Sequence, residues 1–417
     1  MSELAEHPIS VSDPEIIECP YEAYEKLRAE SPVYFDPVTK FYVLTRYEDV
    51  RRALSNLALY TVDDWTSAIQ DKVQQFRSQR AHDRFTKEGW VPGLSIGALP
   101  PEKHVGVRSI FNNAFRASKM KEYEPFIRET AYRLAREFAE KGSGDLVAEF
   151  AMPFPLTVVA HLVGMPAEDL DRVKEWTWAW ITRFGMMLDD EADNAAVSKE
   201  IEFQHYTKKI IDRLRGSPDG SLISEIINTP MPDGNYLTDN ELFMHIQADL
   251  MVAGFETTQN TTSAGMKLLC ENPEIEQLVR SEPDKYLRVF IEEVLRVESP
   301  VQGLFRVAAD DIELHGVTIP KGSLIQLRYG SANRDPEQFG CPAQIDMDRK
   351  VVKHLAFGGG PHGCAGAPLA RLELYWAFRA ILDTMENFRL LPENDLTHFQ
   401  SVVHRGYKQL LISFDKK

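Results

Sequence analysis

The stretch 354–371, HLAFGGGPHGCAGAPLAR, places one cysteine in a loop that is dense in glycine. Glycine tolerates backbone conformations that other residues avoid, so such a loop can lie close to a flat or bulky group. Residues 368–382 are expected to form a helix, which presents Cys364 near a helix N-terminus, where backbone N–H groups and the helix dipole stabilise a thiolate. The loop alone leaves two readings open, a functional thiolate or a buried structural cysteine.

The bulk composition is that of an enzyme-sized globular protein. The chain has 417 residues, of which 43% are hydrophobic and 26% charged, and its net charge is −16. This acidity argues against nucleic acid or an anionic membrane as the partner. The first twenty residues lack the pattern of a signal peptide, and no apolar run reaches the length of a membrane span. The four scattered cysteines favour a reducing, cytoplasmic compartment.

The pattern along the chain predicts a mainly α protein with a small β part, in a single large domain spanning 1–417. Helical periodicity dominates the core, about 102–300. Strand-like runs occupy about 30–60 and 305–330. Residues 60–100 form a long, weakly periodic stretch that suggests a lid or a binding wall.

A long helix is expected from a capping box at Thr238 and Glu241 to Cys270, about 50 Å at 1.5 Å per residue. Its middle reads AGFETT over residues 253–258. A carboxylate such as Glu256 inside a buried helix is expensive unless it is paired or functional. Two readings stay open here, a glutamate satisfied by a neighbouring arginine, or an acid–alcohol pair with Thr257 that handles protons.

A second charged pair lies in FIEEVLRVESP. Glu293 and Arg296 are three residues apart and share a helix face. Such a pair is usually a solvated contact worth only tenths of a kcal/mol, so spacing alone favours a surface ion pair.

Taken together, these motifs resemble the cytochrome P450 family. FGGGPHGCAG at 357–366 matches its haem-thiolate signature, AGFETT at 253–258 its oxygen-activation motif, and Glu293-x-x-Arg296 its E-x-x-R helix. ANRDP at 332–336, followed by Phe339, is another run typical of the family. The likeness extends over essentially the whole chain and points to the soluble bacterial type.

The resemblance implies a cytochrome P450 fold that holds haem b in the loop 354–371, with Cys364 as the axial thiolate and the iron (metal) ligand. A thiolate ligand favours O–O cleavage. His362, Arg306, His104 and Arg108 are implied to bind the haem propionates, since charged donors suit carboxylates. The other implied haem contacts are Ala253, Gly254, Phe357, Gly358 and Gly366. The loop entering the His104 helix reads Leu99-Pro100-Pro101 and departs from the family's Asp-Pro-Pro.

The resemblance also assigns roles on the far side of the haem and in the core. Glu256 and Thr257 are implied to be catalytic, as a positioned acid and alcohol that deliver protons. Glu293 and Arg296 are implied to be structural, with Arg334 nearby.

The resemblance also suggests which residues could line a substrate pocket. Asp249 shares a helical stripe with Ala253 and Glu256, so it is expected either to anchor a polar group of the substrate or to turn aside and pair with a basic residue. An aromatic and methionine-rich lining suits a lipophilic molecule. The candidates are Trp65, Asp249, Val252, Gln302 and Gly303, together with Trp180, Phe184 and Met187, and plain core packing is the alternative for each.

The implied activity is a monooxygenase that uses O2 and two external electrons to hydroxylate, O-dealkylate or epoxidise a small lipophilic substrate. The expected electron donor is a 2Fe-2S ferredoxin with its NAD(P)H-dependent reductase. A basic cluster of Lys103, Arg116, Lys119 and Lys121 is its candidate docking patch, or else a solvated face. A monomer is expected. A peroxide-driven peroxygenase and a non-catalytic haem sensor are the alternatives, and the Glu256–Thr257 pair weighs against both.

Overall fold

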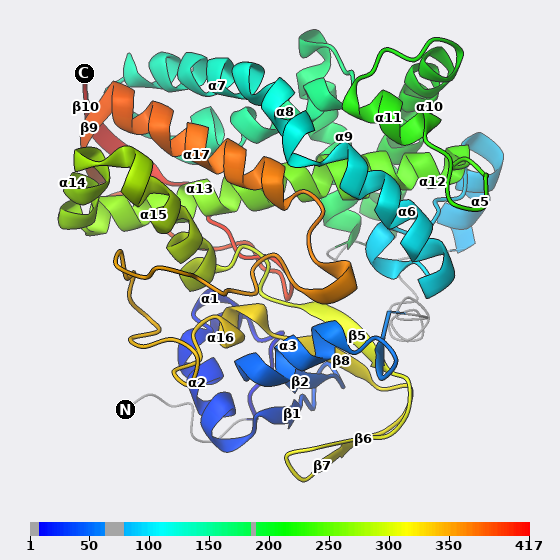
Figure 1. Cartoon of the computed structure of the whole chain (residues 1–417), viewed down its shortest axis with the longest axis horizontal. Helices are drawn as coiled ribbons and strands as arrows, with labels where there is room; N and C mark the ends of the chain where they lie inside the picture. The colour runs from blue at the N-terminus through cyan, green and yellow to red at the C-terminus, as the bar shows by residue number, and fades with distance from the viewer. Residues whose placement is uncertain (1–7, 63–78, 185–188) are drawn as a thin grey trace.

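The computed structural model describes residues 8–62, 79–184 and 189–417. A broad layer of helices lies above a smaller part built from a twisted sheet and short helices (Figure 1). The prediction of a single, mainly α domain with a small β part is confirmed. No helix among the described residues is long and apolar enough to cross a membrane.

The helices fall into the N-terminal region, the large helical layer and the C-terminal third. Their bounds are α1 Pro14–Glu18, α2 Tyr21–Glu30, α3 Tyr47–Ser55, α5 Gln79–Glu88, α6 Pro101–Ala114, α7 Ala117–Ala139, α8 Pro153–Leu162, α9 Leu170–Phe184, α10 Asp190–Gly216, α11 Leu222–Asn228, α12 Asp239–Met244, α13 Ala253–Glu271, α14 Pro273–Ser281, α15 Pro283–Glu298, α16 Tyr329–Ala332 and α17 Ala367–Thr384.

The strands form three small sheets. They are β1 Val33–Phe35, β2 Tyr42–Leu44, β3 Tyr60–Thr61, β4 Ser143–Asp145, β5 Leu304–Ala308, β6 Ile312–Leu314, β7 Val317–Ile319, β8 Leu324–Leu327, β9 Met385–Leu390 and β10 Leu411–Lys416. The main sheet has the order β1-β2-β8-β5-β3, with β2 and β8 parallel and the other neighbours antiparallel. It joins the N-terminal segment to residues 304–327, and so places β5 beside the helical layer.

Helix α13 runs through the middle of the helical layer, with α17 beside it (Figure 1). The apolar side chains of α17 are buried against α7, α13 and α15, which explains its straight course away from the cysteine loop. Close packing is possible at Gly265, because a Cβ there would collide with the ring of Phe378.

The long helix is not regular over its whole length. The capping box is present, with the Thr238 backbone N–H donating to the Glu241 carboxylate at 2.8 Å. Between α12 and α13, however, His245–Val252 is π-helical. Such turns are rare and frequently mark functional sites. The prediction of one uninterrupted α-helix was therefore wrong in this stretch.

Glu293 and Arg296 form a fully buried pair, so the surface reading suggested by spacing alone was wrong. The two side chains are 0% exposed and meet at 2.8 Å. Arg296 also donates to the carbonyls of residues 333, 342 and 344. The third charged partner is Arg349, at 3.1 Å from Glu293. Arg334 instead donates to the Val297 carbonyl and lies over the Tyr21 ring.

Replacing Glu293 by Gln should lower the free energy of unfolding by about 3–5 kcal/mol, because two buried guanidinium groups lose their counter-charge. Urea denaturation followed by circular dichroism measures this. Glu48→Gln is the matched control, since Glu48 forms an exposed pair at the same spacing with Arg51. Its effect should stay within about 1 kcal/mol. Equal effects of the two substitutions would contradict the buried network.

Candidate active site

The cysteine loop is shaped by two glycines in the left-handed region. Gly358 has φ +66° and Gly360 φ +62°. A Cβ on Gly360 would collide with the backbone carbonyl of Leu54, at the end of α3. The loop is closed by the Cys364 backbone N–H, which donates to the Phe357 carbonyl at 2.8 Å. The close approach of Gly360 is thus to α3, a partner that the sequence pattern did not indicate.

The Cys364 thiol faces an internal cavity and is otherwise enclosed by protein. Burial raises its pKa, while the backbone N–H groups of Gly366 and Ala367 and the guanidinium groups of Arg108 and Arg371 oppose the rise. These groups stabilise negative charge on sulfur, as expected for a thiolate at a helix N-terminus.

Four basic side chains gather at one side of this cavity. His104 of α6 stacks on His362 of the loop, with ring centroids 3.9 Å apart. Arg108, Arg306 and His362 all line the cavity. Arg306 is 4% exposed and its Nε has no hydrogen-bond partner, and neither has the Nε2 atom of His104. The structure therefore brings together all four residues that the resemblance linked to carboxylates.

The pKa values in this cluster show that its positive charge is uncompensated. Burial and the neighbouring His104, Arg306 and Arg108 lower the pKa of His362 to about 3. Burial also lowers the pKa of Arg306, and burial together with Arg108 lowers that of His104. A dianionic ligand would relieve this repulsion and satisfy the buried donors.

The cavity extends from the cysteine loop to helix α13. It has a volume of about 380 Å³ and a mainly apolar wall. Ala253, Gly254 and Thr257 of α13 line it, together with Phe357, Gly358 and Gly366 of the loop. The main apolar contributors to the rest of the wall are Phe111, Val159, Trp180, Val252, Val301 and Leu304.

Thr257 of α13 lines the cavity, and Glu256 precedes it on the same helix. The Thr257 hydroxyl donates to the Ala253 carbonyl at 2.9 Å, one turn earlier. Glu256 is 7% exposed, and its Oε1 lies 3.4 Å from Nδ1 of His404. The arginine partner considered from the sequence is thus replaced by a histidine from the C-terminal segment.

A second buried carboxylate lies behind this pair. Glu373 of α17 accepts a hydrogen bond from the Thr258 hydroxyl at 3.1 Å, and its other oxygen has no partner. Burial raises the pKa of Glu373 well above its ordinary value, only partly offset by Thr258.

Asp249 lines the cavity, but its carboxylate is turned to protein partners. It accepts from the Ile96 backbone N–H at 2.9 Å and lies 2.7 Å from Nδ1 of His245. The arrangement corresponds to the turned-aside alternative, with a histidine of its own helix as the basic partner. Asp249 thereby ties the π-helical turn to the segment at Ile96.

The other pocket candidates fall into two groups, those that the structure places away from the cavity and those that lie outside the described residues. Gln302 does not line the cavity, because its side chain accepts from the Tyr24 hydroxyl and donates to two carbonyls of α15 and its cap. Gly303 packs against the backbone of Leu327. Their assignment to the pocket was wrong, and Val301 and Leu304 take these places. Trp65 and Met187 lie outside the described residues, as does the side chain of Phe184.

The expected basic patch is largely neutralised. Lys103 pairs with Glu241, and Arg116 with Glu225 at 3.0 Å. Lys119 is buried and lies 3.2 Å from Glu225. Helices α11 and α12 thus supply counter-charges to three of the four basic residues, which sequence spacing could not show.

A cysteine loop below an apolar cavity, with four basic groups at its edge, defines a protein that holds a flat dianionic cofactor through a thiolate. A model of the cytochrome P450 family matches residues 162–403. Cytochrome P450 109 of Bacillus spizizenii is 32% identical over 370 residues, 87% of this chain and 84% of that protein. The chain belongs to the cytochrome P450 family, whose members are monooxygenases that bind haem b through a cysteine thiolate.

Two further relatives are informative. Vitamin D(3) 25-hydroxylase of Pseudonocardia autotrophica is 32% identical over 401 residues, 94% of this chain and 93% of that protein. The crystal structure of CYP109E1 from Bacillus megaterium in complex with testosterone has a TM-score of 0.81 and 28% identity, covering 94% of this chain and 99% of that one.

The residues in this chain fit haem. The buried Nε of Arg306 and Nε2 of His104 have no hydrogen-bond partner among the described residues, so both could bind the carboxylates of haem. The sequence interpretation missed His404, Glu373 and the Glu292–Arg371 pair below the loop. Glu373 follows the cysteine motif on its helix, so a sequence pattern could have indicated it. His404 lies in an irregular segment, where no sequence pattern marks it.

Gly360→Ala should destabilise the protein by about 1–3 kcal/mol and lower the ratio of bound haem to protein, because a Cβ is strained at positive φ and meets the Leu54 carbonyl. Thermal unfolding and haem quantification measure the two effects. Gly359→Ala is the control, since its backbone is extended and its Cβ would meet only Leu54 Cδ1, at 3.5 Å. A Gly360→Ala variant with unchanged thermal stability and haem content would contradict the close approach to α3.

Glu292 should contribute to stability in a pH-dependent way. Burial raises its pKa, but Arg371 and His354 outweigh this and bring it to about 2. Because the unfolded pKa is 4.5, this stabilisation is complete above about pH 5 and is lost as the pH falls toward 2.

Between pH 5 and 3, the thermal midpoint of the wild type should therefore fall more steeply than that of Glu292→Gln. Glu137→Gln, which removes an exposed carboxylate, should follow the wild type. Parallel curves for the wild type and Glu292→Gln would refute this role.

Proposed function

We propose that this chain hydroxylates, O-dealkylates or epoxidises a lipophilic molecule, using O2 and two electrons from a separate donor. The observation that carries the proposal lies on α13: Thr257 lines a mainly apolar cavity that also contains Cys364, and the adjacent Glu256 pairs with His404, which lines the same cavity. Such a pair suits proton delivery close to a bound substrate.

The proposed roles follow the geometry of the site. Cys364 would hold the haem iron through its thiolate, and Ala253, Gly254, Phe357, Gly358 and Gly366 would bound the cofactor space. Arg108, Arg306, His104 and His362 hold the propionates, which compensates their buried positive charge. Haem supplies O2 activation and oxygen insertion when bound.

On the α13 side, Thr257 positions a hydroxyl in the cavity, and Glu256 holds or passes a proton beside it. The reading as a haem sensor needs no such pair, and a peroxygenase needs no proton delivery of this kind. The monooxygenase reading is therefore favoured over both.

The substrate is proposed to be a bulky, mainly apolar molecule of sterol-like size. Apolar burial is the usual basis of such recognition, and Trp180, Phe111 and Leu304 supply it in the cavity that haem would share. Two relatives support the class, one named a vitamin D(3) hydroxylase and one crystallised with testosterone. Asp249 belongs to the wall as a group that holds the segment at Ile96.

The electron donor is proposed to be a 2Fe-2S ferredoxin with its NAD(P)H-dependent reductase, as expected for a bacterial-type family member. Three residues of the expected basic patch are paired, so docking depends on other parts of the face that carries the cysteine loop.

Purified holoprotein should show, when reduced and treated with CO, the absorption shift that distinguishes thiolate-ligated from histidine-ligated haem. Sterol-like compounds should then change the haem spin state and be oxidised with ferredoxin, reductase, NAD(P)H and O2. Thr257→Ala should keep the CO spectrum but divert electrons to hydrogen peroxide. A protein that gives the CO spectrum and yet oxidises none of these compounds would overturn the proposed substrate class.

A further inference from the structure

His404 stands beside the acid of the proposed proton-handling pair. Its Nδ1 lies 3.4 Å from Oε1 of Glu256, and both His404 and Thr257 line the large cavity. The imidazole is 18% exposed, whereas the carboxylate is 9% exposed. His404 is thus placed between the buried acid and the solvent-accessible side of the cavity.

Glu256 has little else to stabilise its charge. Its second oxygen, Oε2, is buried and has no hydrogen-bond partner within the described part of the chain. A buried carboxylate with one free oxygen is costly unless a counter-charge lies near it. Among the described residues, the imidazole of His404 is the basic group that lies beside this carboxylate.

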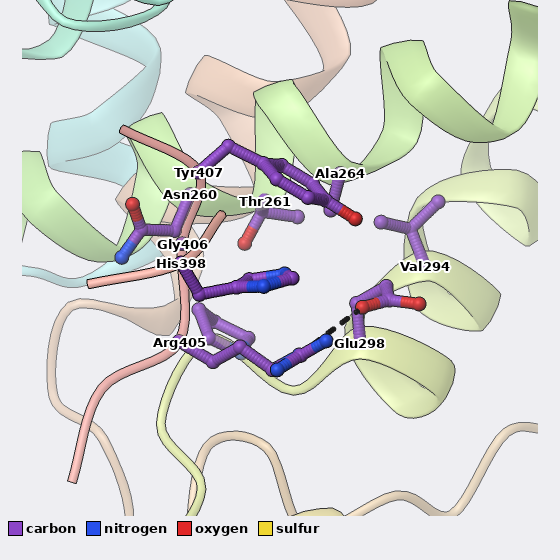
Figure 2. A pocket seen from close by; sticks show the side chains of 10 residues that line it. Asn260, Thr261, Ala264, Val294, Glu298, His398, Arg405, Gly406 and Tyr407 are labelled. Carbon is purple, nitrogen blue, oxygen red and sulfur yellow. Dashed lines mark ion pairs between the residues drawn. The ribbon is translucent and has the colours of Figure 1, made fainter. Parts of the chain in front are cut away.

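The segment that carries His404 is anchored on both sides. The His404 backbone N–H donates to the Ser401 hydroxyl at 3.1 Å, and the residue forms a β-bridge with Val301. Figure 2 shows the continuation of the segment, where Gly406 and Tyr407 lie against α13 and Arg405 reaches toward Glu298 of α15.

Gly406 permits this contact, because a Cβ there would collide with the side chain of Asn260. The segment leaves beside α13 a space of about 10 Å³, room for one water. The imidazole is therefore held in a defined place and is not a mobile surface group.

We propose that His404 is the proton donor of Glu256 and also fixes the orientation of its carboxylate. The imidazolium Nδ1–H bond breaks and an O–H bond forms at Glu256 Oε1; the imidazole then takes a proton from water, and the carboxyl passes its own toward Thr257. The distance of 3.4 Å between Nδ1 and Oε1 is ion-pair distance, which a small rotation of either side chain converts into a direct hydrogen bond. This inference rests on the proposed monooxygenase function.

Other charged groups near this pair are already engaged. On the same helical stretch, Asp249 is paired with His245. Arg405 points away from the cavity, to the carbonyls of residues 17 and 18. Arg306 lies in the same cavity, within the cluster assigned to propionates. Glu373 is engaged by the Thr258 hydroxyl, and burial raises its pKa.

The first experiment compares holoprotein variants in the reconstituted system from pH 6 to 8. His404→Gln should lower product formation about tenfold or more, increase the share of electrons lost to hydrogen peroxide, and flatten the pH dependence of that share. His398→Gln is the matched control, since His398 lies in the same segment and pairs with the carboxylate of Glu18. It should retain the wild-type pH profile.

The second experiment needs no turnover. Diethyl pyrocarbonate reacts with neutral imidazole, and mass spectrometry of the tryptic peptide 390–405 reports His404 and His398 together. In Glu256→Gln holoprotein at neutral pH, His404 should be modified severalfold faster than in the wild type, with His398 unchanged, because loss of the carboxylate frees the imidazole. Equal rates at His404 would overturn the proposed pairing.

The experiments distinguish a failure of the proposed monooxygenase function from a failure of the proposed role of His404. A wild type without turnover would refute the proposed function while the labelling test still reported on the pair. An active wild type whose His404→Gln variant keeps its yield and pH profile would overturn the role of His404 alone. A His404→Gln variant that loses bound haem or helicity is replaced by His404→Asn, to which the same two outcomes apply.

Discussion

The buried carboxylate of Glu293 is the constraint on which the position of the cysteine loop depends. It binds Arg296 and Arg349 and accepts from the Asp346 backbone N–H at 2.8 Å. Arg296 in turn holds three carbonyls of the segment that leads to the loop, and the Asn333 side chain, at the start of this segment, accepts from the Leu355 N–H at 2.6 Å. A residue far from the chemistry thus fixes where Cys364 stands.

The basic cluster beside Cys364, in contrast, lowers the stability of the protein as long as it has no counter-charge. Burial and the positive charges of Arg306 and Arg108 lower the pKa of His362, and burial lowers the pKa of Arg306, so positive charge is costly at this place. Binding of a dianionic cofactor relieves both penalties, and a ligand that binds only the folded state stabilises it. Cofactor affinity and fold stability are therefore coupled in this region.

The distal wall depends on contacts between elements that are remote in sequence. The π-helical turn directs Asp249 to the backbone at Ile96, and the C-terminal segment brings His404 to Glu256. The first contact joins the π-helical turn to the short 3-10 helix Ile96–Ala98, and the second joins α13 to an irregular segment beside the cavity. A helical-wheel argument assigns such side chains to substrate binding. In the structure they hold the walls of the pocket together instead.

The sequence by itself determined the family, the mainly helical architecture, and the local motifs around Cys364, Glu256 and Arg296. These signals are local, because glycine at positive φ, a capping box and an i, i+3 ion pair each depend on a few consecutive residues. Only the tertiary structure decided that Glu293 is buried, that Gln302 leaves the cavity, that Lys119 is neutralised and that His404 meets Glu256. Each of these depends on a partner from another part of the chain, and burial, which sets the strength of a charge interaction, is a property of the packed molecule alone.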